Sequence, residues 1–199
     1  MSESLSPIVA SRWRSWFRAQ VARRGRQKRR SQQLRQCGPE VLIRRNSKKC
    51  VRAGVADGGG FVLDASVTIR WALQDGSAAD RAYADQVLGS LAAGFALVPA
   101  LWYTETIHVL RCAENDGRLG ESALTGFVYR LGQLPIELDP AAPSGIQLAV
   151  GAISREFKLT GYDAQYLELA RRRNMALATL DKDLRKAAKK AGVPIYLMQ

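Results

Sequence analysis

The stretch "FVLDASVTIRW", residues 61–71, decides the fold. Three apolar residues run directly into Asp64, a hydroxyl follows at Ser66, and an amphipathic stretch comes after it. So short an apolar run is typical of a strand that is buried on both faces, as in parallel sheets. The stretch therefore predicts a strand over residues 61–64, a helix over residues 66–73, and a carboxylate at the junction between them.

The same alternation continues to the end of the chain. Short apolar runs predict strands at 61–64, 95–98, 135–138, 176–179 and 194–197. Longer helical patterns predict helices near 66–73, 78–92, 101–116, 121–131, 144–157, 163–173 and 182–191. Strands that alternate with helices in this way indicate an α/β fold, with a mainly parallel sheet flanked by helices.

The positive charge is confined to one end of the chain. Of the 199 residues, the first 60 hold 15 Lys and Arg against 3 Asp and Glu, which accounts for the whole net charge of +12. Residues 61–199 hold 15 of each sign. A basic segment with few apolar residues cannot bury enough surface to offset its ordering entropy. We therefore expect a disordered basic extension over residues 1–60 and one domain over residues 61–199.

Three interpretations of the basic extension stay open. Translation could begin near Val55 or Phe61, in which case the upstream residues are a mis-assigned start. The extension could instead be a nucleic-acid-binding arm. Its arginine-rich, acid-poor composition is also similar to that of an organellar presequence.

Cysteine usage and hydropathy restrict the class of protein. The three cysteines, Cys37, Cys50 and Cys112, are odd in number and form no CxxC pair, so neither a disulfide framework nor a zinc site is indicated. No stretch approaches 18 consecutive apolar residues, and no signal-peptide pattern is present. We expect a soluble cytoplasmic protein without a membrane partner.

Acidic residues follow two of the predicted strands. Asp64 ends the first, and Asp181 comes two residues after the strand at 176–179. Because ligands of parallel sheets bind beyond the carboxyl ends of the strands, both acids are expected at one edge of the sheet. An aspartate after a strand is also an ordinary helix N-cap, so each acid taken singly has a structural explanation as well.

Two further acids interrupt apolar surroundings near helix starts. Glu105 shares a helical stripe with Leu101, His108 and Cys112, and Asp163 opens the helix that follows Gly161. If Asp64, Glu105, Asp163 and Asp181 converge, four like charges cannot all stay ionised without help. Mg²⁺, or Mn²⁺ in its place, binds such oxygen donors and activates water for attack on a phosphodiester. The four acids therefore predict metal-dependent nuclease chemistry.

Other hydrolytic and phosphate-binding sites are not indicated. A single histidine excludes a two-histidine ribonuclease mechanism, and the chain has neither a GxSxG elbow nor a GxxxxGK[ST] loop. An aspartyl phosphatase of the haloacid-dehalogenase type would have a second aspartate at position 66, which is Ser66. A nucleic-acid-binding protein that works through residues 1–60, with a non-catalytic acidic site, remains an alternative.

The chain resembles the PIN-domain endoribonucleases, and among them the VapC-type toxins of bacterial toxin–antitoxin pairs. The resemblance covers residues 61–199 and rests on "VLDASVTIRWAL", "VPALWYTETIHVL", "GRL", "TGYDAQYLELARRRNMALATLDKDL" and "AAGVPIY" in this order. It implies a PIN-like three-layer fold with a mainly parallel five-stranded sheet, and an Mg²⁺-dependent endoribonuclease that cleaves by metal-activated water. It further implies an RNA substrate, an inhibitory antitoxin and a homodimer.

The same resemblance assigns roles to individual residues. The metal-site acids would be Asp64, Glu105, Asp163 and Asp181, with Ser66 and Thr179 as polar supports. His108, a third supporting residue, stands where the family more often has asparagine. A histidine can still hydrogen-bond a neighbouring carboxylate or water, so we expect the site to be retained.

Two interpretations stay open both for Asp183 and for the basic face of the last predicted helix. Asp183 is either an extra acid of the site or a solvent-facing side chain, and we favour the latter. The polar face of the last helix carries Lys182, Arg185, Lys186, Lys189 and Lys190. A solvated face is the plainer interpretation of these residues, and a contact with phosphate is the alternative.

Overall fold

A computed structural model describes residues 59–73, 75–141 and 143–198 of the chain. The disorder predicted for residues 1–60 therefore falls, except for its last two positions, outside the described residues. No helix in the described ranges is long and apolar enough to cross a membrane.

The sheet has four parallel strands in the order β3-β2-β1-β4. They are β1 (Phe61–Leu63), β2 (Ala96–Val98), β3 (Ile136–Leu138) and β4 (Leu177–Ala178). All residues of β1, β2 and β4 are buried, whereas the edge strand β3 is half-buried to exposed. This is the burial expected when helices cover both faces of a parallel sheet, and it explains why the strands appear in the sequence as unbroken apolar runs.

The prediction of a fifth strand at 194–197 was wrong. Only one isolated bridge forms there, between Ile195 and Leu177. Pro194 has no N–H to donate to a ladder, and Leu197 has φ +56°, which ends the extended backbone. At that bridge the N–H of Leu177 donates to the carbonyl of Pro194 and the N–H of Tyr196 donates to the carbonyl of Leu177, both at 2.9 Å, and the ring of Tyr196 stacks 4.0 Å from that of Phe61.

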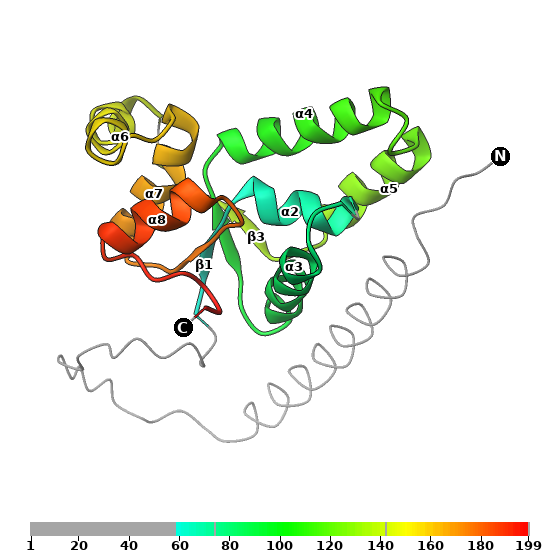
Figure 1. Cartoon of the computed structure of the whole chain (residues 1–199), viewed down its shortest axis with the longest axis horizontal. Coiled ribbons are helices and arrows are strands. Elements are labelled where there is room, and N and C mark those ends of the chain that lie inside the picture. Colours follow the sequence, from blue (N-terminus) through cyan, green and yellow to red (C-terminus); the bar gives the residue numbers. More distant parts are fainter. Residues whose placement is uncertain (1–58, 74, 142, 199) are drawn as a thin grey trace, which may run out of the picture.

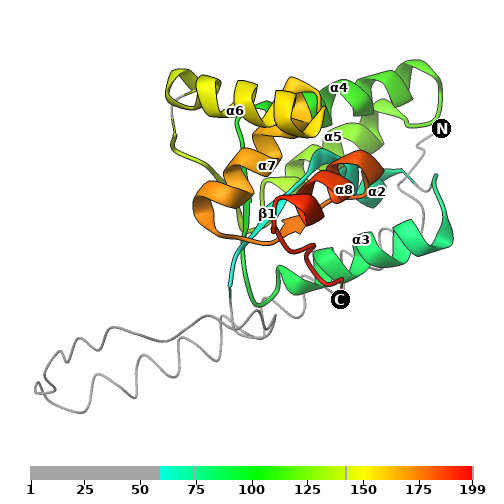
Figure 2. The same ribbon diagram turned by 60° about the vertical axis from the view of Figure 1, so that its left-hand side comes forward.

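Seven helices form the two outer layers within the described residues. On one side of the sheet lie α2 (Ala65–Ala72), α3 (Ala78–Ser90), α4 (Leu101–Asn115) and α5 (Glu121–Leu131). On the other side lie α6 (Pro143–Phe157), α7 (Gly161–Arg173) and α8 (Lys182–Lys190), with the sheet between the two groups (Figure 1). Figure 2 shows α7 and α8 close together on their side of the sheet, with α6 packed against α7. The predicted helices match all seven to within two residues at each end.

The burial of α8 is amphipathic. Leu184, Ala187 and Ala188 are buried under the helix, while its lysines are exposed. The helix runs from Lys182 to Lys190 with Asp181 as its N-cap, and Gly192, just beyond its end, has φ +72°. Glycine accommodates this left-handed conformation without strain, so α8 has a defined start and stop.

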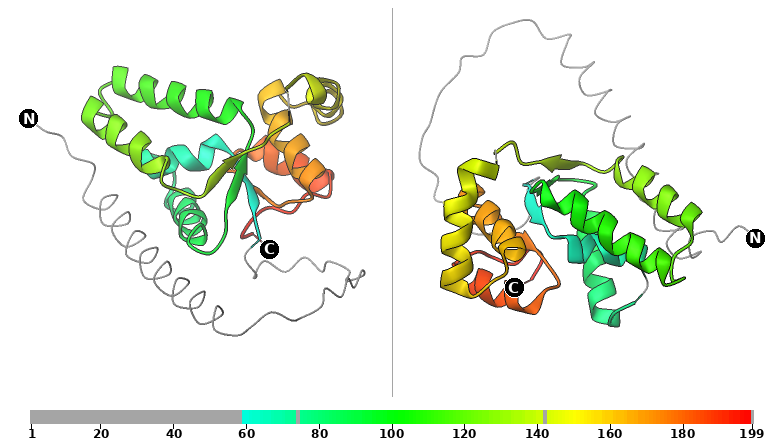
Figure 3. Two further views of the ribbon diagram at one scale, coloured as in Figure 1. Left: turned by 180° about the vertical axis from the view of Figure 1, so that it is seen from behind. Right: turned by 90° about the horizontal axis from the view of Figure 1, so that it is seen from above.

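The order of the strands places a switch point between β1 and β4. The chain passes from β1 to β2 and β3 in one direction, and then returns past both to add β4 on the other side of β1. The helices that follow the two strands, α2 after β1 and α8 after β4, consequently leave for opposite faces of the sheet, as the two views of Figure 3 show. Ligands of open parallel sheets bind at such a point, beyond the carboxyl ends of the strands.

Candidate active site

Asp64 lies at this switch point, directly after β1 and at the start of α2. The residue is only 6% exposed. Two hydroxyl groups donate to the same carboxylate oxygen, Oδ2: Ser66 Oγ at 2.5 Å and Thr179 Oγ1 at 2.6 Å. A buried carboxylate needs such donors, because without them its desolvation would be uncompensated.

The two hydroxyls also join β1 to β4. Ser66 Oγ accepts a hydrogen bond from the N–H of Leu180 at 3.0 Å, and Thr179 Oγ1 accepts one from the N–H of Asp181 at 3.0 Å. Each hydroxyl thus donates to Asp64 and accepts from the loop between β4 and α8. The structure places both of the predicted supporting residues, Ser66 and Thr179, on the carboxylate of Asp64.

Asp181 and Asp163 each sit at the first turn of a helix. The Oδ1 atom of Asp181 accepts from the N–H of Leu184 at 2.7 Å and so caps α8. Asp163 lies in the first turn of α7, where Thr160 Oγ1 donates to its Oδ2 at 2.7 Å and accepts from its N–H at 3.1 Å. Asp181 is therefore the helix N-cap that its position after a strand suggested, and this hydrogen bond fixes where its carboxylate lies.

Glu105 comes from α4 and is oriented by a residue of α7. The hydroxyl of the buried Tyr166 donates to Glu105 Oε2. Tyr166 follows Asp163 by one helical turn, so a single helix supplies one acid and the support of another. The site thus combines residues of α2, α4, α7 and α8.

The charges of these acids act on one another. Burial raises the pKa of Asp64, against the hydrogen bonds from Ser66 and Thr179, and the charge of Asp163 raises it further. Burial also raises the pKa of Glu105, with added contributions from Asp64 and Asp163. The pKa of Asp163 is raised by burial and by the charges of Asp181 and Asp183. The acids are therefore electrostatically coupled, because the charge of one carboxylate makes Asp64, Glu105 or Asp163 harder to ionise.

The donor chemistry of this cluster fits a hard divalent cation. All of the acids offer carboxylate oxygens, the ligands that Mg²⁺ and Mn²⁺ prefer, and a cation among them would lower the raised pKa values of Asp64, Glu105 and Asp163. Among the described residues, no three acidic, histidine or cysteine side chains lie close enough together to hold an ion jointly. A hollow of about 600 Å³ lies elsewhere, on the outer surface of α5, and is lined by none of these acids.

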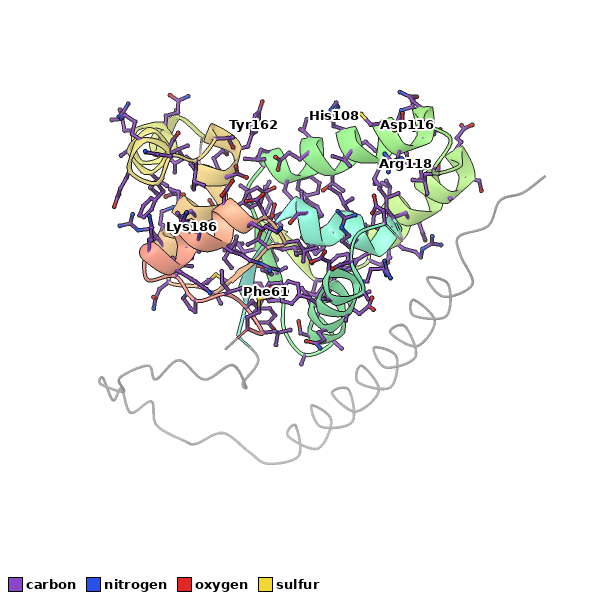
Figure 4. All side chains as sticks on the ribbon, in the orientation of Figure 1. Phe61, His108, Asp116, Arg118, Tyr162 and Lys186 are labelled. Carbon is purple, nitrogen blue, oxygen red and sulfur yellow. The ribbon has the colours of Figure 1, made fainter. Side chains whose placement is uncertain are left out.

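His108 is not brought into the acidic cluster. It lies three residues after Glu105, about 60° around the helix axis, and its side chain is exposed on α4 (Figure 4). Its Nε2 atom lies 3.8 Å from the Sγ atom of Cys112, which is exposed as well. The structure therefore gives no support to a hydrogen bond from His108 to a neighbouring carboxylate. Asp183 is exposed, in keeping with the solvent-facing role that we favoured.

Two residues that orient acids were not singled out from the sequence. Tyr166 holds Glu105, and Thr160 holds Asp163. Thr160 carried a recognisable signal, because a threonine three residues before an acid is a common helix start. Tyr166 carried none, since an aromatic residue on the inner face of a helix is usually part of the core.

Comparisons with protein families and with solved structures found matches. The PIN domain family matches residues 61–190. Among solved structures, the crystal structure of PAE2754 from Pyrobaculum aerophilum is similar, with 22% sequence identity and a TM-score of 0.48, over 65% of this chain and 80% of that one. No curated protein matches the chain. The family match covers well over half of the sequence, and the chain therefore belongs to the PIN-domain family, whose members are generally metal-dependent nucleases.

Proposed function

We propose that the protein is an Mg²⁺-dependent endoribonuclease whose working acids are Asp64, Glu105, Asp163 and Asp181. The observation that carries the proposal is the buried carboxylate of Asp64, held by two hydroxyls at the switch point of the sheet. The acids of α4, α7 and α8 are electrostatically coupled to it or to one another. Membership of a generally nucleolytic family supports the same conclusion.

The side chains of this chain would prepare the site for the cation and the substrate. Ser66 and Thr179 hold Asp64 in one orientation and favour its ionised form, against the effect of burial. Tyr166 does the same for Glu105, and Thr160 for Asp163. A bound Mg²⁺ would supply the positive charge that these acids lack and would make water a stronger acid at neutral pH. Preorganised carboxylates are what such chemistry requires, because they need not reorganise during the reaction.

We further propose that the protein is the toxin component of a VapBC-type toxin–antitoxin pair. The motifs around Asp64, Glu105, Asp163 and Asp181 support this in their order and spacing. An antitoxin partner that stops cleavage and a homodimeric toxin are part of the proposal. It predicts that a small inhibitory protein is encoded directly upstream of this chain, and that adding this protein abolishes cleavage.

The chemistry of the products tests the ribonuclease. The full chain, incubated with RNA and Mg²⁺, should cut internally and leave a 5′-phosphate and a 3′-hydroxyl, because water rather than the 2′-hydroxyl is the nucleophile. A substrate with 2′-deoxy sugars at the cleavage position should still be cut. EDTA should stop the reaction. Ends with a 2′,3′-cyclic phosphate would contradict the proposal, and RNA binding without any cleavage would favour a nucleic-acid-binding protein instead.

A further inference from the structure

The only histidine of the chain lies one helical turn before a cysteine. His108 and Cys112 are both on α4, four positions apart, and both are exposed (Figure 4). Side chains at this spacing share one face of a helix. The Nε2 atom of His108 lies 3.8 Å from the Sγ atom of Cys112. A nitrogen donor and a sulfur donor thus lie side by side on the surface of α4, and we call them the His108–Cys112 pair.

Neither packing nor helix stability explains the pair. Cysteine is among the residue types most often buried, whereas Cys112 is exposed. Histidine and cysteine also form helices less readily than alanine, lysine or glutamate, which are common at exposed helix positions. In the part of the chain that the structure describes, neither side chain has another hydrogen-bond or ion-pair partner. The contact between them is itself weak, because a thiol is a poor hydrogen-bond donor and both groups face water.

The separation of the two donor atoms is close to that in a tetrahedral zinc site. Zinc–sulfur bonds of about 2.3 Å and zinc–nitrogen bonds of about 2.1 Å, at the tetrahedral angle, place the two donor atoms about 3.6 Å apart. The observed distance is 3.8 Å. A small rotation of either exposed side chain is enough to remove the difference. The pair is therefore arranged so that one ion can contact both donors.

The donor types select a different class of metal from the acids of the candidate active site. Imidazole nitrogen and thiolate sulfur suit Zn²⁺, whereas Mg²⁺ prefers the oxygens that carboxylates offer. Among residues 59–73, 75–141 and 143–198, no further cysteine or acidic side chain lies close enough to join the pair. The protein thus supplies two ligands, and water completes the coordination. Such a site contains no CxxC pair, so the cysteine spacing did not reveal it.

The charges around the pair do not oppose a dication. Arg111 lies between the two residues in sequence and forms an ion pair with Glu114. Arg118, beyond the end of α4, forms ion pairs with Asp75 and Asp116. Within α4 there is one arginine against two glutamates, so the helix carries a net negative charge. A divalent cation at this surface therefore meets neutralised or negative surroundings.

We propose that the His108–Cys112 pair is a surface site for a divalent transition-metal ion, with Zn²⁺ as the expected ion. The neutral imidazole binds through Nε2, and the thiol binds as a thiolate after it releases its proton to water. Two waters complete the tetrahedron. The inference does not depend on the proposed ribonuclease function, because it uses none of the four acids.

The test uses the full-length protein with Cys37→Ser and Cys50→Ser, so that Cys112 is its only thiol. This parent protein is reduced and then titrated with Co²⁺, which takes the same ligands as Zn²⁺. Bound Co²⁺ absorbs strongly in the near ultraviolet only where a thiolate is one of its ligands. A large excess of Mg²⁺ is present throughout to occupy sites made of oxygen ligands. The thiolate band should appear, and excess Zn²⁺ should remove it by displacing the cobalt.

Three variants of the parent protein separate a chelating pair from a single thiol. His108→Asn should weaken Co²⁺ binding by about 100-fold, because the second donor no longer binds within the same molecule. Cys112→Ser should abolish the band. Cys112→Ser combined with Asn115→Cys is the matched control, since it keeps one thiol and the histidine on α4 but sets them two turns apart. This control should bind as weakly as His108→Asn. Circular dichroism should show every variant folded, because all of the replaced α4 side chains are exposed.

Two results would overturn the proposal. One is the absence of a thiolate band in the parent protein. The other is an affinity of His108→Asn, or of the variant with the displaced cysteine, equal to that of the parent, because a lone thiol would then account for the binding. Failure of the proposed ribonuclease is distinguishable: the wild type would then not cleave RNA in Mg²⁺, while the thiolate band and its loss in the variants would remain.

Discussion

Replacing Thr179 with valine removes one hydroxyl from the centre of the site without changing its shape. Thr179 is fully buried, and its hydroxyl donates to Asp64 and accepts from the N–H of Asp181. Valine has nearly the same volume, so no cavity forms and only the two hydrogen bonds are removed. The variant therefore measures what holding Asp64 contributes to the fold.

The expected destabilisation follows from these two bonds. A hydrogen bond to a charged group contributes about 1.5–3 kcal/mol, and the N–H of the exposed Asp181 adds about 1 kcal/mol because water can replace part of its partner. The sum is about 2.5–4 kcal/mol, which corresponds to a fall in Tm of about 5–15 °C for a domain of this size. Thr179→Ser keeps the hydroxyl and should recover most of the loss. Thr125→Val makes the same change at an exposed position of α5 and should leave Tm unchanged.

The pH dependence of this loss is the decisive feature. The hydrogen bond from Thr179 lowers the pKa of Asp64, although burial leaves that pKa above its ordinary value of 3.8. The bond therefore adds stability where Asp64 is ionised, and this stability disappears as the pH falls and the carboxyl becomes protonated. Urea unfolding in EDTA, from mildly alkaline to acidic pH, should show the difference between wild type and Thr179→Val shrinking. A difference that stays constant with pH would refute the reasoning.

Three further predictions concern the acidic cluster. Tyr166→Phe removes the hydrogen bond that lowers the pKa of Glu105, so cleavage should fall, whereas Tyr103→Phe on the exposed side of α4 should cleave normally. Mg²⁺ should raise the Tm of the wild type, since a ligand of the folded state stabilises it, and this shift should largely vanish in Asp64→Asn; equal shifts would place the ion elsewhere. In EDTA the raised pKa values of Asp64, Glu105 and Asp163 cost stability as the pH rises through them, so Asp64→Asn should gain Tm relative to the wild type on going from acidic to neutral pH.

Most of the fold could be predicted from the sequence, because the strands are buried on both faces and so appear as short apolar runs. An apolar run such as Phe61, Val62 and Leu63 has few structural interpretations other than a buried strand, once a polar residue and a helical pattern follow it. The segment at 194–197 shows the limit of this reasoning. Its apolar pattern is equally strong, but Pro194 and the left-handed backbone of Leu197 prevent a ladder. Hydropathy does not reveal whether the backbone of such a segment can form a ladder with the neighbouring strand.

The site was less predictable than the fold because its supports come from distant positions. The hydroxyl of Thr179 reaches Asp64 across 115 positions, and Tyr166 reaches Glu105 across 61. The first of these was expected from the resemblance, and the second was not. His108 shows the converse: its spacing from Glu105 suggested a shared face, but the rotation of about 60° between them is enough to turn it toward solvent.

The central claim is that Asp64 makes the protein a metal-dependent ribonuclease. The most direct measurement compares RNA cleavage by the wild type, Asp64→Asn and Asp116→Asn, purified identically and assayed in Mg²⁺ and in EDTA. Asp116 is an exposed aspartate at the far end of α4 (Figure 4) and serves as the matched control. The account predicts cleavage by the wild type and Asp116→Asn in Mg²⁺ alone, and none by Asp64→Asn under either condition. Cleavage by Asp64→Asn at the wild-type rate would contradict it.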